Sequence, residues 1–344
     1  MEILHVSRPV TVADLHDIPD PSVDAIRSET LLARCPLANE TPLTEAEAIA
    51  VEAGVAQVWV KDERGRMGLG SFKALGAAYV IARHGDAAPG RTFVTATAGN
   101  HGLSVAAGAA AFGAHSVIYI AETVPEAFAA RLRDQGAEVC KEGETYEAAM
   151  AAAKAAAATN GWHLLSDAAW PGYTADPLGV MEGYLALMAE TIRQLPQIPS
   201  HIFLQAGVGG LAAACAALAR KTWGDGPRIV VVEPAAAPAL HSSISAGHPV
   251  TASGPVSVMG RLDCKTPSLI ALKGLARDAD DFALITDQES QAGAGTAMVA
   301  GFASTPSGAA GIAALLALDP DQQQALDITA TSTVLCILSE GPET

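Results

Sequence analysis

Basic residues are scarce in this chain of 344 residues. Lysine and arginine together number 21 against 37 aspartates and glutamates, which gives a formal net charge of −16 at pH 7. Nucleic acids and anionic membranes bind basic surfaces, so we expect neither as a partner. A small anionic ligand remains compatible with this charge, because a few local hydrogen-bond donors are enough to hold it.

Long apolar runs are also missing, although half of the residues are hydrophobic. The apolar segment that begins at Leu211 stops at Arg220, well short of the length that crosses a bilayer. Residues 1–5 contain no basic segment followed by an apolar core, so we expect no signal peptide. The pattern predicts a protein without a membrane span.

Clustered cysteines are absent as well. The five cysteines are odd in number and scattered, with no CxxC pair and no Cys/His cluster. This usage is typical of reduced thiols in a cytoplasmic protein and indicates neither a disulfide framework nor a metal site. The residues concerned are Cys35, Cys140, Cys215, Cys264 and Cys336.

The chain itself is long enough for two domains with sizeable cores. Short apolar runs alternate with helical patterns over most of its length, which predicts parallel sheets covered by helices on both faces. Expected strands lie at 58–60, 92–95, 116–121, 137–140, 162–165, 202–205, 228–232, 282–285 and 333–338. The fold class is therefore α/β, with two doubly wound open-sheet domains and a cleft between them.

Lys73 is the residue around which the chain is organised. A strand ending at Val60 is followed by a charged, glycine-rich turn, and Ser71 is a good N-cap for the helix that contains Lys73. The next positions on the same helix face, such as Gly76 and Val80, are small or apolar. A buried lysine there has a lowered pKa or reacts, and both options lead to Schiff-base chemistry. The alternative is a lysine that reaches solvent.

A second glycine-rich segment, Gly207-Val208-Gly209-Gly210-Leu211, lies between a strand and a helix. Backbone N–H groups at such a turn form a natural cradle for a phosphate. Together with Ala212 the segment also fits a loose GxGxxA dinucleotide pattern, and Glu233 lies where a ribose-binding acid is expected. The remaining alternative is that the glycines only permit close packing of helix on strand.

Two further polar segments follow strand ends, where ligands bind in such folds. Residues 97–102 (TAGNHG) offer donors at a helix N-terminus that suit a carboxylate, although an ordinary capped loop has the same appearance. His101 is either a general base or a structural histidine. Asp167 is either catalytic or a turn-capping aspartate.

In combination, these segments resemble the fold-type II pyridoxal-phosphate enzymes, the group of threonine and serine dehydratases and cysteine synthases. Within the group the strongest resemblance is to the diaminopropionate ammonia-lyases. It is carried by residues 61–79, 97–102, 166–184, 204–213, 231–234, 307–311 and 339–344. The resemblance implies a tryptophan synthase β-like homodimer. Residues 1–84 and 178–344 would form a large cofactor-binding domain, and residues 85–177 a smaller mobile one.

The resemblance implies a pyridoxal 5′-phosphate site and a role for each matching residue. Lys73 would form the Schiff base and later move the Cα proton, and Asn100 would hydrogen-bond the pyridine 3′-oxygen. Phe72 would pack against the ring, and Ser339 would face its nitrogen. The phosphate would be held by Gly207, Val208, Gly209, Gly210 and Leu211.

The same resemblance implies a small amino acid as substrate. Its carboxylate would bind at Thr97, Ala98, Gly99, Asn100 and His101. Asp167 would hold or protonate the leaving β-amino group. In the lyases the residue before Gly-Asn-His carries a carboxylate, which is thought to be the base for the D-isomer. Because this chain has Ala98 there, we expect loss of D-isomer turnover or a different β-substituent.

The expected activity is therefore α,β-elimination from L-2,3-diaminopropionate, giving pyruvate and ammonia. Serine or threonine dehydration, or another β-elimination, is the alternative within the class. Two alternatives come from other classes: an NAD-dependent dehydrogenase that uses the GxGxxA pattern, and a pyridoxal-phosphate binder without catalysis.

Overall fold

The computed structural model describes residues 1–97 and 99–342, and within them it contains two β-sheets. The larger sheet has the order β1-β10-β9-β8-β11-β3-β2, and the smaller one the order β6-β5-β4-β7. The strands of the larger sheet are β1 (Glu2–His5), β2 (Leu43–Glu45), β3 (Gln57–Asp62), β8 (His201–Gln205), β9 (Arg228–Pro234), β10 (Asp281–Ile285) and β11 (Thr333–Leu338). Those of the smaller sheet are β4 (Thr92–Ala96), β5 (His115–Ile120), β6 (Glu138–Lys141) and β7 (His163–Leu164).

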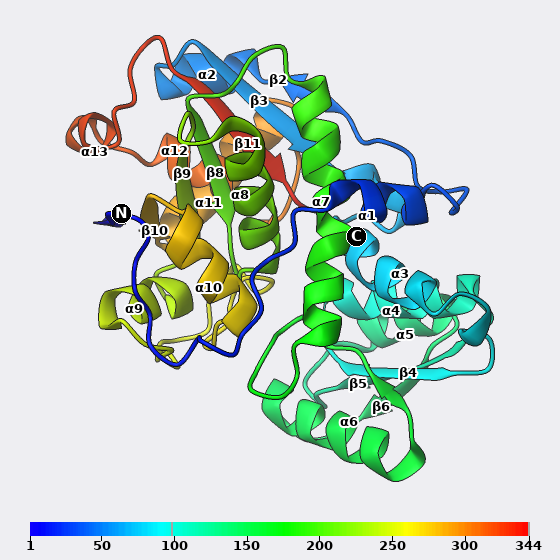
Figure 1. Cartoon of the computed structure of the whole chain (residues 1–344). Helices are drawn as coiled ribbons and strands as arrows, with labels where there is room; N and C mark the ends of the chain where they lie inside the picture. Colours follow the sequence, from blue (N-terminus) through cyan, green and yellow to red (C-terminus); the bar gives the residue numbers. More distant parts are fainter. Residues whose placement is uncertain (98, 343–344) are drawn as a thin grey trace.

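Helices cover both sheets (Figure 1). They are α1 (Ala25–Leu32), α2 (Glu47–Ala53), α3 (Lys73–Arg83), α4 (Asn100–Ala111), α5 (Glu126–Asp134), α6 (Tyr146–Asn160), α7 (Ala175–Gln194), α8 (Gly210–Trp223), α9 (Ala239–Ala246), α10 (Leu269–Asp278), α11 (Asp287–Val299), α12 (Ala310–Leu316) and α13 (Pro320–Ala325). Short 3₁₀ segments, η1 (Glu63–Gly68) and η2 (Gly85–Ala87), follow β3 and α3. Among the described residues, no helix combines the length and the apolar character needed to cross a bilayer.

The central strands are apolar at nearly every position because both of their faces are buried. In β8, Ile202 and Leu204 point into the core that contains α7 and α8. Phe203, between them, points into the opposite core, which contains α12. Successive side chains of a strand point to opposite faces, so burial on both sides requires a continuous apolar run.

The sequence located the central strands but not the two sheet edges. The pairs within the centre of each sheet are parallel, as predicted, whereas β1 pairs with β10 and β2 pairs with β3 in the antiparallel sense. Neither β1 nor β2 is among the predicted strands. Both are short and partly exposed, so they lack the apolar run that marks a central strand.

Helix α7 lies between the two sheets and packs closely on α3 (Figure 1). A Cβ on Gly183 would lie 2.5 Å from the Leu75 carbonyl oxygen, and one on Gly76 would lie 2.7 Å from the Tyr184 ring. Neither distance is tolerated, so the close crossing of the helices depends on these glycines. It places the Tyr184 ring beside the start of α3.

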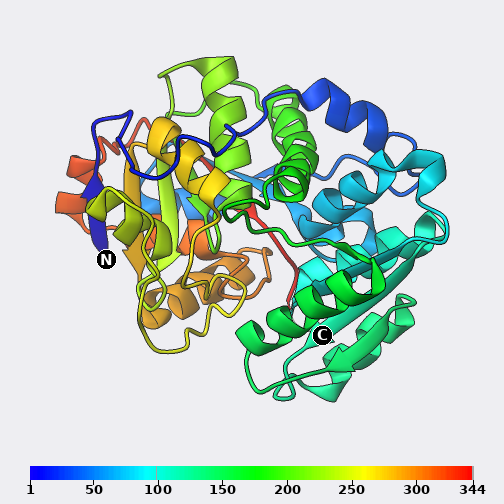
Figure 2. The ribbon, with the colours of Figure 1, turned by 60° about the horizontal axis from the view of Figure 1, so that its bottom comes forward.

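We refer to the two sheets with their covering helices as the seven-stranded unit and the four-stranded unit. Figure 2 shows β11, in red, running toward the boundary between them. The strands of the four-stranded unit all fall within residues 92–164, inside the predicted smaller domain. The domain boundaries at 84/85 and 177/178 stay predictions.

Candidate active site

The first residue of α3, Lys73, contacts an acidic side chain from the segment after β7. Lys73 Nζ lies 2.5 Å from Asp167 Oδ2, and the two side chains are 22% and 19% exposed. The lysine ammonium also lies over two rings, 5.3 Å from the centroid of Phe72 and 5.8 Å from that of Tyr184. Side chains from α3, from α7 and from the segment after β7 thus meet at one lysine.

This contact corrects the expected charge state of Lys73. Burial by itself would lower the pKa of the lysine, as the sequence indicated, but the Asp167 carboxylate raises that pKa above its usual range. For the aspartate, burial acts to raise the pKa, and the charge of Lys73 holds it below its usual value. Lys73 and Asp167 are therefore an ion pair at neutral pH in the protein without cofactor.

The start of α3 differs by one residue from the predicted start. Phe72 is the N-cap residue and makes no side-chain cap, so the prediction that Ser71 caps the helix is wrong by one position. The Ser71 hydroxyl still accepts a hydrogen bond, from the Lys73 backbone N–H at 3.2 Å. The consequence is small, because Lys73 lies in the first turn as expected.

The segment after β11, residues 339–341, lies beside the start of α3. The Phe72 backbone N–H donates to the Ser339 carbonyl at 3.1 Å, and the Gly341 N–H donates to the Gly70 carbonyl at 3.0 Å. Ser339 follows β11, which is paired with β3, and its side chain is buried. Sheet pairing therefore brings Ser339 next to Phe72, as the predicted cofactor site requires.

The glycine-rich turn before α8 has the geometry of a narrow cradle. Gly209 is the N-cap and has φ +96°, a conformation that favours glycine. A Cβ on Gly207 would lie 3.0 Å from the sulfur of Cys264 and 3.2 Å from the Arg261 carbonyl oxygen. Because the first N–H groups of a helix have no partner within the helix, the start of α8 presents donors to an anion.

Cys264 is a member of this site that sequence reasoning missed. Burial raises the pKa of its thiol to about 12, and the charge of Asp167 acts in the same direction. The Val208 backbone N–H donates toward the sulfur. No motif surrounds Cys264, so only its tertiary neighbours reveal its place.

The predicted carboxylate loop begins α4. The Gly99 N–H donates to the Thr97 hydroxyl at 3.0 Å, and Asn100 is the first helical residue. The His101 ring is buried and its Nε2 donates to the Leu165 carbonyl at 2.9 Å. Burial lowers the pKa of His101, and this geometry supports the structural alternative for that residue. Ala98 lies outside the described residues.

The Asn100 side chain has a hydrogen-bond partner outside this loop. Its side-chain amide donates to the carboxylate of Glu340, a residue that the sequence analysis did not assign. In the sequence, Glu340 belongs to the SEGPET segment that carries part of the family resemblance. Within that segment only the neighbouring Ser339 has a predicted role.

A buried ionic cluster fixes the loop that leads to Lys73. Lys61 Nζ lies 2.7 Å from Glu190 Oε2, and Arg66 contacts both Glu190 and Glu63 at 2.7 Å. All four side chains are buried. Burial lowers the pKa of Lys61, whereas Glu63 and Glu190 overcome the effect of burial on Arg66 and raise the pKa of its guanidinium. The cluster anchors η1 to α7.

Comparison with known proteins decides the family. Residues 35–340 match the family described as pyridoxal-phosphate dependent enzyme. The chain belongs to this family. The predicted fold class, fold type II, is thereby confirmed together with the cofactor, pyridoxal 5′-phosphate.

Individual relatives of the pyridoxal-phosphate family extend the likeness over most of the chain. Diaminopropionate ammonia-lyase of Salmonella typhimurium is 31% identical over 343 residues, which cover 88% of this chain and 85% of that protein. Human L-serine dehydratase/L-threonine deaminase is 31% identical over 259 residues, covering 75% and 76%. The structure of diaminopropionate ammonia-lyase from Escherichia coli with an aminoacrylate-PLP azomethine reaction intermediate has a TM-score of 0.87 at 27% identity, covering 99% and 93%.

The residues present fit this cofactor. Lys73 supplies an amine, the turn at Gly207 is too crowded for a side chain and leaves its backbone N–H groups as donors, and Ser339 is held beside Phe72. The dinucleotide alternative fits less well. Glu233, its expected ribose ligand, is buried and accepts hydrogen bonds from the backbone N–H groups of Leu240 and His241 at 2.8 and 2.7 Å.

Proposed function

We propose that the protein is a pyridoxal-phosphate-dependent ammonia-lyase that removes the β-amino group of L-2,3-diaminopropionate. Loss of the α-proton and the β-amino group leaves 2-aminoacrylate, whose hydrolysis gives pyruvate and a second ammonia. Two relatives support the class of reaction: the Salmonella lyase acts on diaminopropionate by name, and the Escherichia coli lyase was captured with an aminoacrylate intermediate.

The observation that carries the proposal is the contact between Lys73 and Asp167. Asp167 Oδ2 lies 2.5 Å from Lys73 Nζ, and a positive charge there holds the pKa of the carboxyl group below its usual range. When Lys73 acts as a neutral base, the β-ammonium group of the substrate takes the place of that charge. A β-ammonium group is cationic and is stabilised by that carboxylate, whereas a serine hydroxyl needs a proton donor to leave. The pair therefore favours diaminopropionate over serine as substrate.

Each of the other predicted site residues has its own role in the proposed reaction. Bound pyridoxal phosphate supplies an electron sink that acidifies the Cα proton of the substrate. The Lys73 amine takes that proton, and Asp167 holds the β-ammonium group. Residues 97–101, at the N-terminus of α4, bind the substrate carboxylate. Ser339 offers a neutral hydroxyl to the pyridine nitrogen, which favours elimination over racemisation.

Dehydration of serine or threonine is the second candidate, because the human serine dehydratase/threonine deaminase is also similar to this chain. The two candidates differ in what the site must do with the leaving group. We expect kcat/KM for L-2,3-diaminopropionate to exceed that for L-serine and L-threonine by at least about tenfold.

The test is a visible absorption titration of the purified holoenzyme with L-2,3-diaminopropionate, coupled to detection of pyruvate. The cofactor band should shift or bleach as pyruvate forms, and Lys73→Ala should abolish both the band of the lysine-linked cofactor and turnover. A band that L-serine shifts but L-2,3-diaminopropionate does not would assign the dehydratase activity instead. A band that no β-substituted amino acid moves would reject catalysis and leave a cofactor-binding protein.

A homodimer in the cytoplasm is part of this proposal. The five cysteines are free, which supports a reducing compartment. Light scattering after size-exclusion chromatography should give twice the chain mass of 35.0 kDa, and a monomer mass would reject the dimer.

A further inference from the structure

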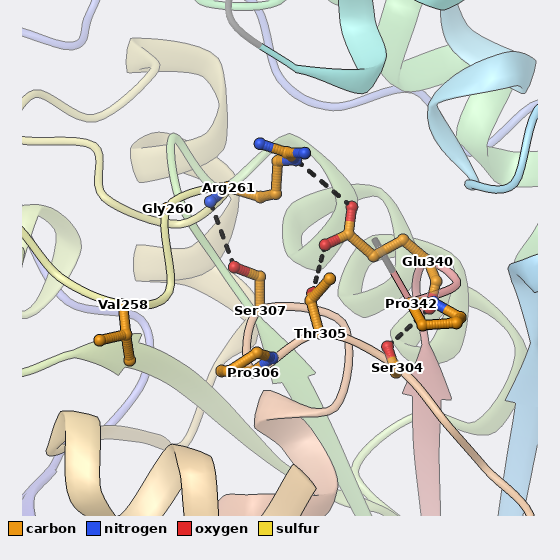
Figure 3. Close-up of a pocket in the computed structure, with 9 residues that line it drawn as sticks. All are labelled: Val258, Gly260, Arg261, Ser304, Thr305, Pro306, Ser307, Glu340 and Pro342. Carbon is orange, nitrogen blue, oxygen red and sulfur yellow. Dashed lines mark hydrogen bonds and ion pairs between the residues drawn. The ribbon is translucent and has the colours of Figure 1, made fainter. Parts of the chain in front are cut away.

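The carboxylate of Glu340 contacts side chains from three separate segments of the chain. Figure 3 shows two of these contacts, with Arg261 and with Thr305. The Asn100 amide, at the start of α4 in the four-stranded unit, donates to Oε2. The Thr305 hydroxyl, from the segment before α12, donates to Oε1. Arg261, from the loop between α9 and α10, places its Nε 3.7 Å from Oε2. Glu340 itself is buried, immediately after Ser339.

Residues 304–308 pack closely around Glu340. A Cβ on Gly308 would lie 2.8 Å from Glu340 Cγ and 3.0 Å from its carbonyl oxygen, so only glycine fits there. The Ser304 hydroxyl donates to that carbonyl at 2.6 Å. The Gly308 N–H donates to the Thr305 hydroxyl at 2.9 Å and holds it in place. This packing holds the backbone of Glu340 and its hydrogen-bond partner Thr305 in place.

The contact determines which way the Asn100 amide faces. A carboxylate only accepts hydrogen bonds, so it selects the NH₂ side of the amide and directs the carbonyl oxygen elsewhere. An asparagine without such a partner can present either its oxygen or its nitrogen. Because an NH₂ group carries two hydrogens, Asn100 keeps a second N–H for another acceptor once Glu340 has taken the first.

The contact also links the two units. Asn100 begins a helix of the four-stranded unit, whereas Glu340, Thr305 and Arg261 belong to segments of the seven-stranded unit. A small cavity of about 320 Å³ lies on the seven-stranded side of this contact, lined in part by Arg261, Thr305 and Glu340. The guanidinium of Arg261 places positive charge next to the buried carboxylate.

We propose that Glu340 is a positioning residue, which orients the Asn100 amide so that its free N–H points to the 3′-oxygen of the cofactor. The inference rests on the assignment of Asn100 to that oxygen, which is part of the proposed function. Glu340 does not touch the reacting atoms. It acts through Asn100 and couples the cofactor site to the relative position of the two units.

The test measures cofactor binding rather than turnover, so its outcome is independent of which amino acid is the substrate. The apparent Kd of the apoprotein for pyridoxal 5′-phosphate is obtained by fluorescence titration for Glu340→Ala, Asn100→Ala and the double variant. We expect each single variant to weaken binding by about tenfold, the effect of losing one hydrogen bond, and the double variant to be no weaker than either one. The pH titration of the visible band of the holoenzyme should change in the same way in all three.

Two further variants separate positioning from mere packing. Glu340→Gln keeps an acceptor oxygen of the same reach and should restore the Kd to within about threefold of wild type. Thr305→Val removes a different hydrogen bond to the carboxylate and should lower the melting temperature while the Kd stays within about twofold. Circular dichroism verifies that each variant is folded.

Three outcomes would overturn the proposal. In the first, the effects of Glu340→Ala and Asn100→Ala multiply in the double variant, as for independent sites. In the second, Thr305→Val weakens binding as much as Glu340→Ala does. In the third, Glu340→Ala lowers the melting temperature and leaves both the Kd and the visible pH titration unchanged.

Discussion

Lys73 Nζ and Asp167 Oδ2 lie 2.5 Å apart, although 94 positions separate the two residues in the chain. The lysine begins α3 and the aspartate follows β7, so the pair forms only when the four-stranded unit is in place beside α7. The contact determines the charge of the Lys73 amine, the group that reacts with the cofactor. It also places an acidic group at the base, which is the arrangement that the proposed elimination needs.

Replacing Asp167 with asparagine should change the pH at which Lys73 reacts with the cofactor. The carboxylate raises the pKa of Lys73 while burial acts to lower it, so without the carboxylate the pKa falls below the ordinary value of 10.5. More neutral amine is then present at pH 7–8, and the apoprotein should combine with pyridoxal phosphate faster than wild type. The pH profile of the rate of cofactor binding, measured by stopped-flow absorption, should move toward lower pH.

The same variant should lose turnover by about 10²–10³-fold, the usual loss when one preorganised electrostatic partner of the reacting group is removed. Asp167→Glu is the matched control, because it keeps the charge and should leave the reconstitution profile near that of wild type. A reconstitution profile of Asp167→Asn that coincides with wild type would contradict the role assigned to the ion pair.

Gly207→Ala should weaken cofactor binding at least about tenfold. The new Cβ would lie 3.0 Å from the sulfur of Cys264 and 3.2 Å from the Arg261 carbonyl oxygen, so the turn must shift. Its backbone N–H groups then no longer point to the phosphate. The cost of such overpacking to the free energy of unfolding is about 1–3 kcal/mol. Titration with pyridoxal phosphate and chemical denaturation measure the two effects.

Gly210→Ala is the control for this substitution. Its Cβ would meet Met181 at an ordinary 3.5 Å, and alanine is favoured over glycine in a helix. We expect little change in affinity. Unchanged affinity for pyridoxal phosphate in Gly207→Ala would mean that the loop is not the phosphate cradle.

Glu190→Ala should lower the free energy of unfolding by about 3–5 kcal/mol, because it leaves Lys61 and Arg66 as poorly compensated buried charges. The pKa of Glu190 is lowered in the folded protein: burial acts to raise it, but the hydrogen bond and charge of Arg66 prevail. The stabilisation is therefore present above the unfolded pKa, near 4.5, and is lost as the pH falls.

Urea unfolding at pH 7 and at decreasing pH measures this effect. Arg193→Ala is the comparison, since Arg193 is 49% exposed and pairs with Glu29 and Glu40 at the surface. It should cost no more than about 1 kcal/mol. Similar losses for Glu190→Ala and Arg193→Ala would show that the buried cluster does not anchor the loop.

Ala98 should determine the stereochemical range of the reaction. This prediction rests on the sequence alone, since Ala98 lies outside the described residues. Wild type should turn over L-2,3-diaminopropionate and not the D-isomer, and Ala98→Asp should raise the ratio of D to L turnover by at least about tenfold. The measurement is the rate of pyruvate formation from each isomer separately. Equal wild-type rates on the two isomers would contradict the prediction.

The sequence by itself determined the fold class and the two backbone motifs of the site. The buried strands are marked by apolar runs, and the turns at Lys73 and Gly207 are marked by glycines and by the start of a helix. These are local signals, because backbone freedom and burial on both faces leave their trace in neighbouring residues. The edge strands β1 and β2 have no such trace, and the sequence missed them.

Only the tertiary structure decided the charges and the partners. Asp167 reverses the expected shift in the pKa of Lys73, Glu190 meets Lys61 across 129 positions, and Glu340 meets Asn100 across 240. The energy of each of these groups depends on which charge or donor lies within a few ångströms. That distance is set by how strands from distant parts of the chain pair and how α7 crosses α3, not by the residues next to each group in the chain.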